Sequence, residues 1–286
     1  MNLCNERELR DLLARHGFRF TKSMGQNFLI NPDIPAAIAD ASGAGQDCGV
    51  LEIGPGVGAL TVELARRAGK VLSVELDRAL LPILAETLSD CPNAEVVPGD
   101  ALKLDLDALA TEKFQGLTPI ICANLPYNIT SPILEKLIQT PRFQRVTVLL
   151  QKEVAERLSA PDGSGDGGAF SLFLRYHMEP ELLFAVSREN FLPRPKVDSA
   201  VLRCTRRTRP AVEVEDEAYF FRVVRGAFLL RRKTIVNSLA AALPELSKDA
   251  IRNAVTACGL SETVRGERLT LQNFADLSER LRAAQT

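Results

Sequence analysis

Residues 50–59 read VLEIGPGVGA, an apolar run that passes through a glycine-rich turn into a new segment. Glycine allows the backbone to turn sharply there and to approach a ligand closely. Beyond the turn, Val57, Leu60, Thr61, Leu64 and Ala68 recur at the spacing of one helix face. The stretch therefore predicts a strand, a ligand-binding turn and a helix, the opening unit of a Rossmann-like α/β fold.

The same alternation of β-branched runs and amphipathic helical segments continues to about residue 150, which is typical of a parallel sheet covered by helices on both faces. A helix is expected to start with Thr130 or Ser131 as its N-cap and Pro132 in its first position. A flexible surface loop is expected at 161–168, and two further strands are expected to add an antiparallel edge. The predicted strands are residues 50–53, 71–75, 95–98, 120–123, 146–150, 182–186 and 199–204.

Only helical patterns follow residue 209, and we expect helices at about 217–230, 234–243, 248–258 and 271–283. The chain thus predicts two domains, a mostly parallel α/β domain at 1–209 and a smaller all-helical domain at 210–286.

Composition places the chain among ordinary soluble globular proteins, since 46% of its 286 residues are hydrophobic, 25% are charged and the net charge is −1. Six scattered cysteines without a C-x-x-C pair, and only two histidines, predict no metal site and no disulfide framework. The mixed charges of the first residues lack the apolar core of a signal peptide, so a cytoplasmic location is expected. The uncharged stretch 114–134 contains three prolines and two asparagines, which argues against a membrane span.

Polar residues end the predicted strands at one edge of the sheet. The carboxyl ends of parallel strands open onto a common ligand site, and Gly54, Glu75, Asp100 and Asn124 each stand at such an end. Glu75 can accept hydrogen bonds from both ribose hydroxyls, and Asp100 can accept one from an adenine amino group. Because Gly54, Gly56 and Ala59 also satisfy the pattern G-x-G-x-x-A, a nicotinamide or flavin enzyme remains open at this point.

The fourth strand end carries Asn124-Leu125-Pro126-Tyr127, a set of groups suited to a flat base with an amino group. The Asn124 side chain can accept one amino N–H, and a backbone carbonyl of Leu125 or Pro126 can accept the other. Tyr127 can stack on the base. A dehydrogenase needs no such groups beside its cofactor, whereas an amino methyltransferase does.

With these residues assembled, the chain resembles the KsgA (RsmA) family of ribosomal RNA adenine N6-dimethyltransferases. The resemblance runs almost end to end. The motifs that carry it are GQNFL at 25–29, LEIGPG at 51–56, VELD at 74–77, GDA at 99–101, NLPYNI at 124–129, LQKEV at 150–154, F-x-P-x-PKVDSAV at 191–201 and RRKTI at 231–235.

This resemblance implies a class I methyltransferase whose methyl donor is S-adenosyl-L-methionine. It implies two adjacent adenosines in a hairpin near the 3′ end of 16S rRNA, in the immature small ribosomal subunit, as substrate, and a monomeric enzyme. It also implies that the N-terminal segment folds over the cofactor. The implied cofactor contacts are Asn27, Leu29, Gly54, Glu75, Asp100 and Asn124.

Basic residues in the C-terminal domain predict phosphate contacts, which position RNA without reading its sequence. The predicted RNA-binding residues are Arg222, Arg225, Arg231, Arg232 and Lys233, and Phe191 is expected to close the base pocket. Two alternatives remain open: a large-subunit rRNA adenine methyltransferase of the antibiotic-resistance type, and a ribosome assembly factor on the same fold that lacks catalysis.

Overall fold

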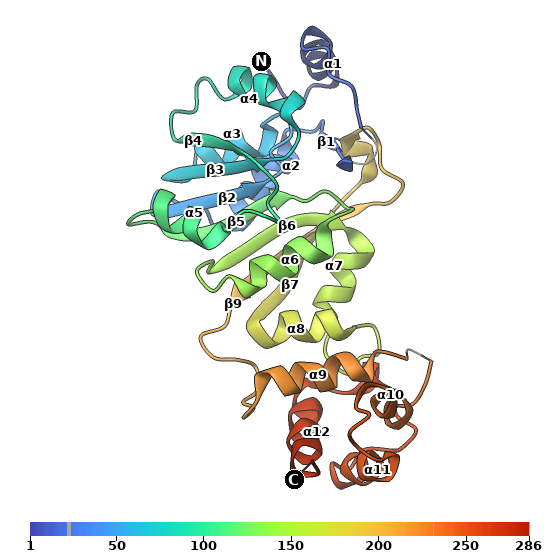
Figure 1. The fold of residues 1–286 in the computed structure, drawn as a ribbon. Coiled ribbons are helices and arrows are strands. Elements are labelled where there is room, and N and C mark those ends of the chain that lie inside the picture. The colour runs from blue at the N-terminus through green and yellow to red at the C-terminus, as the bar shows by residue number, and fades with distance from the viewer. Residues whose placement is uncertain (22–23, 231, 286) are drawn as a thin grey trace. The chain divides into compact units, whose positions relative to one another are not determined.

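The computed structural model describes residues 1–21, 24–230 and 232–285. The chain divides into two compact units (Figure 1). The sheet unit comprises Met1–Ala155 and Pro180–Arg206, and the helical unit comprises Glu156–Glu179 and Arg207–Thr286. The predicted boundary at residue 209 lies close to the second junction, but the prediction of a single boundary is wrong for 156–179. That segment belongs to the helical unit because Leu172 and Tyr176 join its hydrophobic cluster.

The sheet has seven strands in the order β4-β3-β2-β5-β6-β9-β7 (Figure 1). Neighbouring strands from β4 to β6 pair in parallel, and β9 pairs antiparallel with β6. This confirms the predicted sheet, with each strand extending one to four residues beyond its expected bounds at one or both ends. The strands are β2 (Cys48–Ile53), β3 (Lys70–Glu75), β4 (Ala94–Pro98), β5 (Thr118–Asn124), β6 (Arg145–Gln151), β7 (Met178–Val186) and β9 (Ser199–Arg206). A separate antiparallel pair joins β1 (Phe28–Leu29) to β8 (Phe191–Leu192).

The helices that accompany the sheet are α1 (Glu6–Arg15), α2 (Asp33–Ser42), α3 (Ala59–Ala65), α4 (Leu81–Thr87), α5 (Leu106–Lys113) and α6 (Thr130–Gln139), with short 3₁₀ turns η2 (Arg78–Leu80) and η3 (Arg188–Asn190). Helix α7 (Lys152–Ser159) crosses the first junction, so that residues 152–155 belong to the sheet unit and residues 156–159 to the helical unit. Helix α6 starts at Thr130 with Ile129 as its N-cap, so Pro132 is its third residue and not its first. Proline is still tolerated there because the N–H groups of the first helical turn have no partner within the helix.

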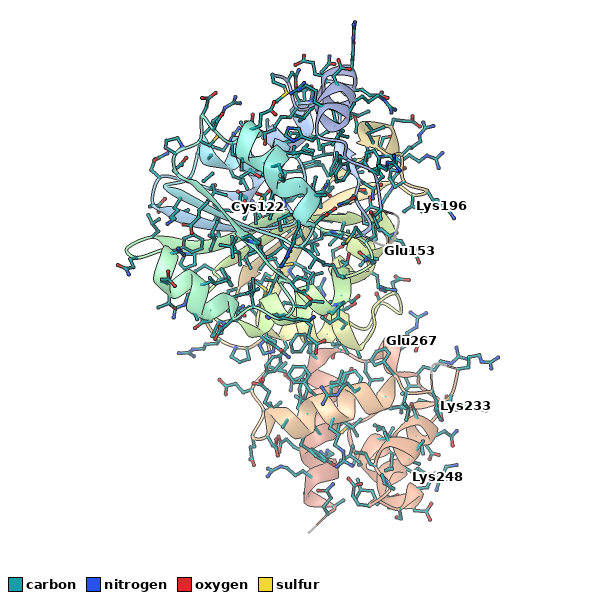
Figure 2. The ribbon with its side chains drawn as sticks, turned by 45° about the horizontal axis from the view of Figure 1, so that its top comes forward. Cys122, Glu153, Lys196, Lys233, Lys248 and Glu267 are labelled. Atoms are coloured by element: carbon teal, nitrogen blue, oxygen red, sulfur yellow. The ribbon has the colours of Figure 1, made fainter. Side chains whose placement is uncertain are left out.

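The core of the sheet unit lies between the strands and these helices. All six residues of β2 are buried, as expected for a central strand covered on both faces. Cys122, in the interior of β5, is fully buried (Figure 2). Burial of its thiol raises the pKa of Cys122, which therefore packs as a small neutral core residue.

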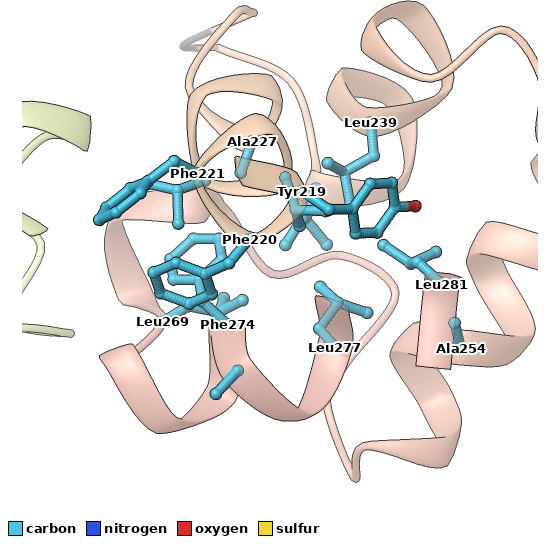
Figure 3. Packing of buried hydrophobic residues seen from close by; sticks show 14 of the residues in the cluster. Tyr219, Phe220, Phe221, Ala227, Leu239, Ala254, Leu269, Phe274, Leu277 and Leu281 are labelled. Carbon is cyan, nitrogen blue, oxygen red and sulfur yellow. The ribbon is translucent and has the colours of Figure 1, made fainter. Parts of the chain in front are cut away.

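The helical unit is built from α8 (Ala169–His177), α9 (Glu217–Ala227), α10 (Ile235–Ala242), α11 (Lys248–Ala257) and α12 (Leu271–Ala283), with the 3₁₀ turn η4 (Gly266–Arg268). Phe220, Phe274 and Leu277 are fully buried in its core (Figure 3). Helix α9 ends three residues before the predicted end, because the Phe228 and Leu229 N–H groups donate to carbonyls three residues back, each at 3.2 Å. The next N–H, of Leu230, donates to the Ser238 hydroxyl at 3.0 Å and does not resume the helix. Among the described residues, no helix combines the length and apolar character that crossing a membrane requires.

Candidate active site

The glycine-rich turn after β2 lies on one wall of a cleft at the carboxyl ends of the parallel strands. Gly54 and Gly56 have φ values of 68° and 62°, in the left-handed region that favours glycine. A Cβ on Gly56 would also lie 3.0 Å from the Phe28 ring. The turn therefore needs glycine both for its backbone conformation and for its contact with the N-terminal segment.

Glu75 is held by backbone groups at the end of β3. Its Oε1 accepts a hydrogen bond from the Asp77 N–H at 2.7 Å, and its Oε2 accepts one from the Gly56 N–H at 3.3 Å. The side chain is 6% exposed, and burial raises the pKa of Glu75 although these N–H groups lower it. The carboxylate is thereby fixed at the cleft wall, next to the glycine-rich turn.

Asp100 stands beyond the end of β4. Its Oδ1 accepts a hydrogen bond from the Leu102 N–H at 3.0 Å, and its Oδ2 lies 3.6 Å from the Lys103 Nζ. The turn bond orients the carboxylate at the cleft wall, where it can accept a further hydrogen bond from a ligand.

Asn124 ends β5, and its side-chain amide is oriented by the N-terminal segment. Its Nδ2 donates to the Asn27 backbone carbonyl at 3.1 Å. This contact assigns the nitrogen, so the Oδ1 is the atom of the amide that can accept a ligand N–H. Asn27 in turn donates from its own Nδ2 to the Gly25 carbonyl at 3.0 Å. The segment before β1 is therefore bonded to the strand end that carries the predicted catalytic amide.

Two backbone carbonyls follow Asn124, and only one is well placed to accept from a ligand. The Pro126 carbonyl already accepts from the Ile129 N–H and from the Thr130 Oγ1, each at 3.2 Å. A carbonyl has two lone pairs, so these bonds use its capacity. The Leu125 carbonyl is the remaining candidate of the two that the sequence suggested.

The predicted catalytic and cofactor residues all line this one cleft, whose volume is about 1130 Å³ including the space open to solvent. They are Asn27, Leu29, Gly54, Glu75, Asp100, Asn124, Leu125, Pro126 and Tyr127. The structure brings them together from the N-terminal segment and from the ends of four strands. What each of them does there remains a prediction.

Two further cleft residues were not singled out by sequence reasoning. Leu76 is an apolar side chain that is 52% exposed at the cleft, and its place directly after Glu75 at a strand end could have identified it. Gln26 donates from Nε2 to the Asp77 Oδ2 at 2.7 Å, while its Oε1 is buried without a hydrogen-bond partner among the described residues. No sequence signal connects Gln26 to Asp77, which lies 51 residues further along the chain.

Phe191 is the predicted site residue that the structure places elsewhere. It is 2% exposed, pairs through β8 with Leu29 of β1, and packs in the hydrophobic cluster of the sheet unit. Phe191 is not among the described residues that line the cleft. Its position is that of a core residue, because the β1–β8 pairing turns it inward.

The predicted RNA-binding arginines and lysine lie on the helical unit. Arg225, Arg232 and Lys233 are exposed, and Lys233 is marked in Figure 2. Arg222 is exposed as well but forms an ion pair with Glu245 at 2.8 Å. Arg231 lies outside the described residues. Within the part of the chain that the structure describes, no group of three or more His, Cys, Asp or Glu side chains could hold a metal ion.

The sheet order, the glycine-rich turn and the acidic residue at the end of β3 define a class I methyltransferase fold of the Rossmann-like type. A family model described as ribosomal RNA adenine dimethylase matches residues 17–282, and the chain belongs to that family. It is therefore a methyltransferase, and the nicotinamide or flavin alternative is set aside.

Individual relatives agree with this assignment. A protein of Geobacillus thermodenitrificans named ribosomal RNA small subunit methyltransferase A is 47% identical over 277 residues, covering 95% of this chain and 94% of the relative. A Bacillus mycoides protein of the same name is 44% identical over 276 residues, covering 95% and 94%. The crystal structure of the 23S rRNA methyltransferase ErmE superposes with a TM-score of 0.69 at 30% identity, covering 89% of this chain and 99% of that one. A dimethyladenosine transferase from Plasmodium falciparum gives a TM-score of 0.66 at 26% identity, covering 87% and 95%.

Proposed function

We propose that this enzyme transfers methyl groups from S-adenosyl-L-methionine to N6 of two adjacent adenosines in a hairpin loop near the 3′ end of 16S rRNA, giving N6,N6-dimethyladenosine. The substrate is the RNA of the immature small ribosomal subunit, in the cytoplasm, and the enzyme acts as a monomer. The observation that carries the proposal is the oriented amide of Asn124, which lies in one cleft with Tyr127 and the acidic residues of the neighbouring strand ends.

The cleft residues suit the proposed cofactor. S-adenosylmethionine carries ribose hydroxyls and an adenine amino group, which are donors, and the cleft offers the carboxylates of Glu75 and Asp100 as acceptors. The Gln26 Oε1 is a further buried acceptor that has no protein partner among the described residues. The backbone near Asn27, Leu29 and Gly54 would hold the remainder of the molecule. When bound, the cofactor supplies an electrophilic methyl group on a sulfonium.

The protein's own task is to position a poor nucleophile. The lone pair of an adenine amino group is delocalised into the ring, so N6 needs to be oriented toward the methyl group. The Asn124 Oδ1 and the Leu125 carbonyl accept the two N6 hydrogens and set that orientation, and proximity supplies much of the remaining rate. No base needs to remove a proton before attack, because N6–H becomes acidic only after it has gained the methyl group.

Tyr127 provides the surface on which the target base rests. Swinging a nucleotide out of its stack costs a few kcal/mol. Stacking on an aromatic ring returns about 1–3 kcal/mol per base and does not depend on sequence. The cost and the gain are therefore of similar size.

A large-subunit activity is the second candidate, because a 23S rRNA methyltransferase shares the fold at 30% identity. The small-subunit substrate is favoured by relatives that are 44% to 47% identical and carry the small-subunit name. A role in assembly without catalysis is disfavoured, because the Asn124 to Tyr127 run, Glu75 and Asp100 are all present in the cleft.

Replacement of Asn124 tests the proposed chemistry. We expect Asn124→Ala to lower kcat for methyl transfer to immature small subunits by about 100-fold, since misplacing a reacting group costs about that much. Binding of S-adenosylmethionine, followed by calorimetry, is the control and separates loss of chemistry from loss of cofactor. Unchanged turnover with normal cofactor binding would remove Asn124 from the mechanism.

A further inference from the structure

The ring of Tyr127 is bonded to a distant strand. Its hydroxyl oxygen lies 2.6 Å from the Oγ of Ser199, which is 72 residues further along the chain. Tyr127 is half-buried and lines the cleft, whereas Ser199 is fully buried as the first residue of β9. Burial raises the pKa of Tyr127, although the bond to Ser199 lowers it. The phenol thus stays neutral and able to share this hydrogen bond at physiological pH.

Ser199 is a rigid attachment point because its backbone is fixed by strand pairing and by hydrogen bonds of the preceding residue. It stands opposite Gln151 in the β6–β9 ladder. The preceding carbonyl, of Asp198, accepts from the Lys152 N–H at 3.0 Å, and the Asp198 Oδ1 accepts from the Arg188 N–H at 3.0 Å. A hydroxyl on this backbone has little freedom to move.

Tyr127, by contrast, follows the end of its strand. Strand β5 ends at Asn124 and α6 begins at Thr130, so the ring projects from the connection between them. Stacking on a base requires an aromatic face but no hydroxyl, and phenylalanine would serve. The Tyr127 hydroxyl therefore has a role other than stacking, and its hydrogen bond to Ser199 indicates that this role is to hold the ring.

We propose that Ser199 is a positioning residue for methyl transfer, and that its hydroxyl holds the Tyr127 ring in the plane on which the target adenine stacks. This inference rests on the proposed function and deepens it. The segment 191–201 then acts on the base through Ser199, although Phe191 itself is buried in the core.

A double-mutant cycle tests the proposal. Ser199→Ala and Tyr127→Phe each remove the bond, and we expect each to lower kcat by about 10-fold. The double variant should also lose about 10-fold and not about 100-fold, because the second change has no bond left to break. Losses that multiply in the double variant, or wild-type turnover in Ser199→Ala, would overturn the proposal.

A spectroscopic signal distinguishes positioning of the ring from general damage to the fold. The fluorescence of 2-aminopurine is quenched when this base stacks on an aromatic ring. With 2-aminopurine at the target position, the bound RNA should therefore fluoresce more strongly with either single variant, in which the ring is not held in place, than with the wild type. If Ser199→Ala does not fold, Tyr127→Phe alone tests the proposal, since it removes a single oxygen atom and retains the aromatic ring. Wild-type fluorescence in Tyr127→Phe would contradict the inference.

Thr147 offers a matched control on the neighbouring strand. It is fully buried in β6, and its Oγ1 has no hydrogen-bond partner among the described residues. Thr147→Val should keep kcat within about threefold of the wild type, since no bond is lost. An equal loss in Thr147→Val and Ser199→Ala would show a general effect of buried hydroxyls and overturn the assignment. A wild-type enzyme that binds S-adenosylmethionine yet methylates no adenosine would instead refute the proposed function, and this inference with it.

Discussion

Glu52 is a carboxyl group buried beneath the glycine-rich turn, and only 1% of it is exposed. The hydroxyls of Thr61 and Ser73 donate to its Oε2 at 2.6 and 2.7 Å. These bonds join β2 to α3 and β3 at the position where the cleft begins. Burial, opposed by the two hydroxyls and assisted by the charge of Glu75, raises the pKa of Glu52 to about 7.

This pKa predicts a specific pH dependence of stability. A carboxyl whose pKa rises on folding stabilises the folded state below its unfolded pKa of 4.5, and this contribution is lost as pH rises through about 7. The loss for Glu52 is about 3 kcal/mol. Glu52→Gln stays neutral, so its free energy of unfolding relative to the wild type should rise between pH 5 and pH 8. Urea unfolding at both pH values measures this, and parallel stability profiles for the two proteins would contradict it.

Whether a feature of the site can be predicted from the sequence depends on how far along the chain the interacting residues lie. Glu75, Asp100 and Asn124 could be predicted because the end of a parallel strand is itself a sequence feature. The Ser199 partner of Tyr127 and the Asp77 partner of Gln26 could not, since they depend on contacts between segments 72 and 51 residues apart. Phe191 was misplaced for the same reason, because its burial follows from the β1–β8 pairing.

The loop at 161–168 is held by hydrogen bonds at two points, although its glycines and aspartates predict a flexible segment. The Asp162 Oδ2 accepts from the Leu271 N–H at 2.8 Å, at the first residue of α12. Arg268 donates to the Ser164 carbonyl at 2.6 Å. Asp162 therefore supplies α12 with a second side-chain acceptor, beside its own N-cap Thr270.

Loss of this cap should weaken the helical unit. We expect Asp162→Ala to lower the free energy of unfolding by about 1 kcal/mol, the usual cost of removing a side-chain acceptor at a helix N-terminus. Asp166, exposed in the same loop, provides the control, and its replacement by alanine should stay within about 0.5 kcal/mol of the wild type. Urea unfolding monitored by circular dichroism measures both variants. Equal free energies of unfolding for the two would show that Asp162 does not cap α12.

Strands and helices were predictable from periodicity, whereas their ends depended on side-chain bonds. The β-branched runs found all seven strands of the sheet. The end of α9 could not be predicted, because Phe228 and Leu229 form tighter turn bonds and the Leu230 N–H bonds to the Ser238 hydroxyl, eight residues away. The place of α8 in the helical unit was missed because Leu172 and Tyr176 pack with residues far along the chain.

The protein as a whole carries a net charge of −1, whereas its RNA substrate is strongly negative. Local charge resolves this, since Arg225, Arg232 and Lys233 are exposed on the helical unit. Contacts between such residues and phosphates give an affinity that falls steeply with salt.

Neutralising two of the predicted RNA-binding residues should change the salt dependence of RNA binding. We expect replacement of both Arg231 and Arg232 by glutamine to reduce the slope of log affinity against log salt by about 1 to 2. Arg252 supplies the control, because it is paired with Asp249 and Glu262 on the same unit. A slope that changes as much in Arg252→Gln as in the double variant would argue against phosphate contacts at 231 and 232.

Methylation of adenine N6 in the small subunit is tested most directly by a nucleotide map of the product. Immature small subunits and large subunits are incubated separately with the wild-type enzyme and isotopically labelled S-adenosylmethionine, and the digested RNA is analysed by mass spectrometry. We predict N6,N6-dimethyladenosine at two adjacent positions in a hairpin near the 3′ end of 16S rRNA, and none in large subunits. Label in 23S rRNA alone, or at any atom other than adenine N6, would show that the enzyme does not carry out the proposed reaction.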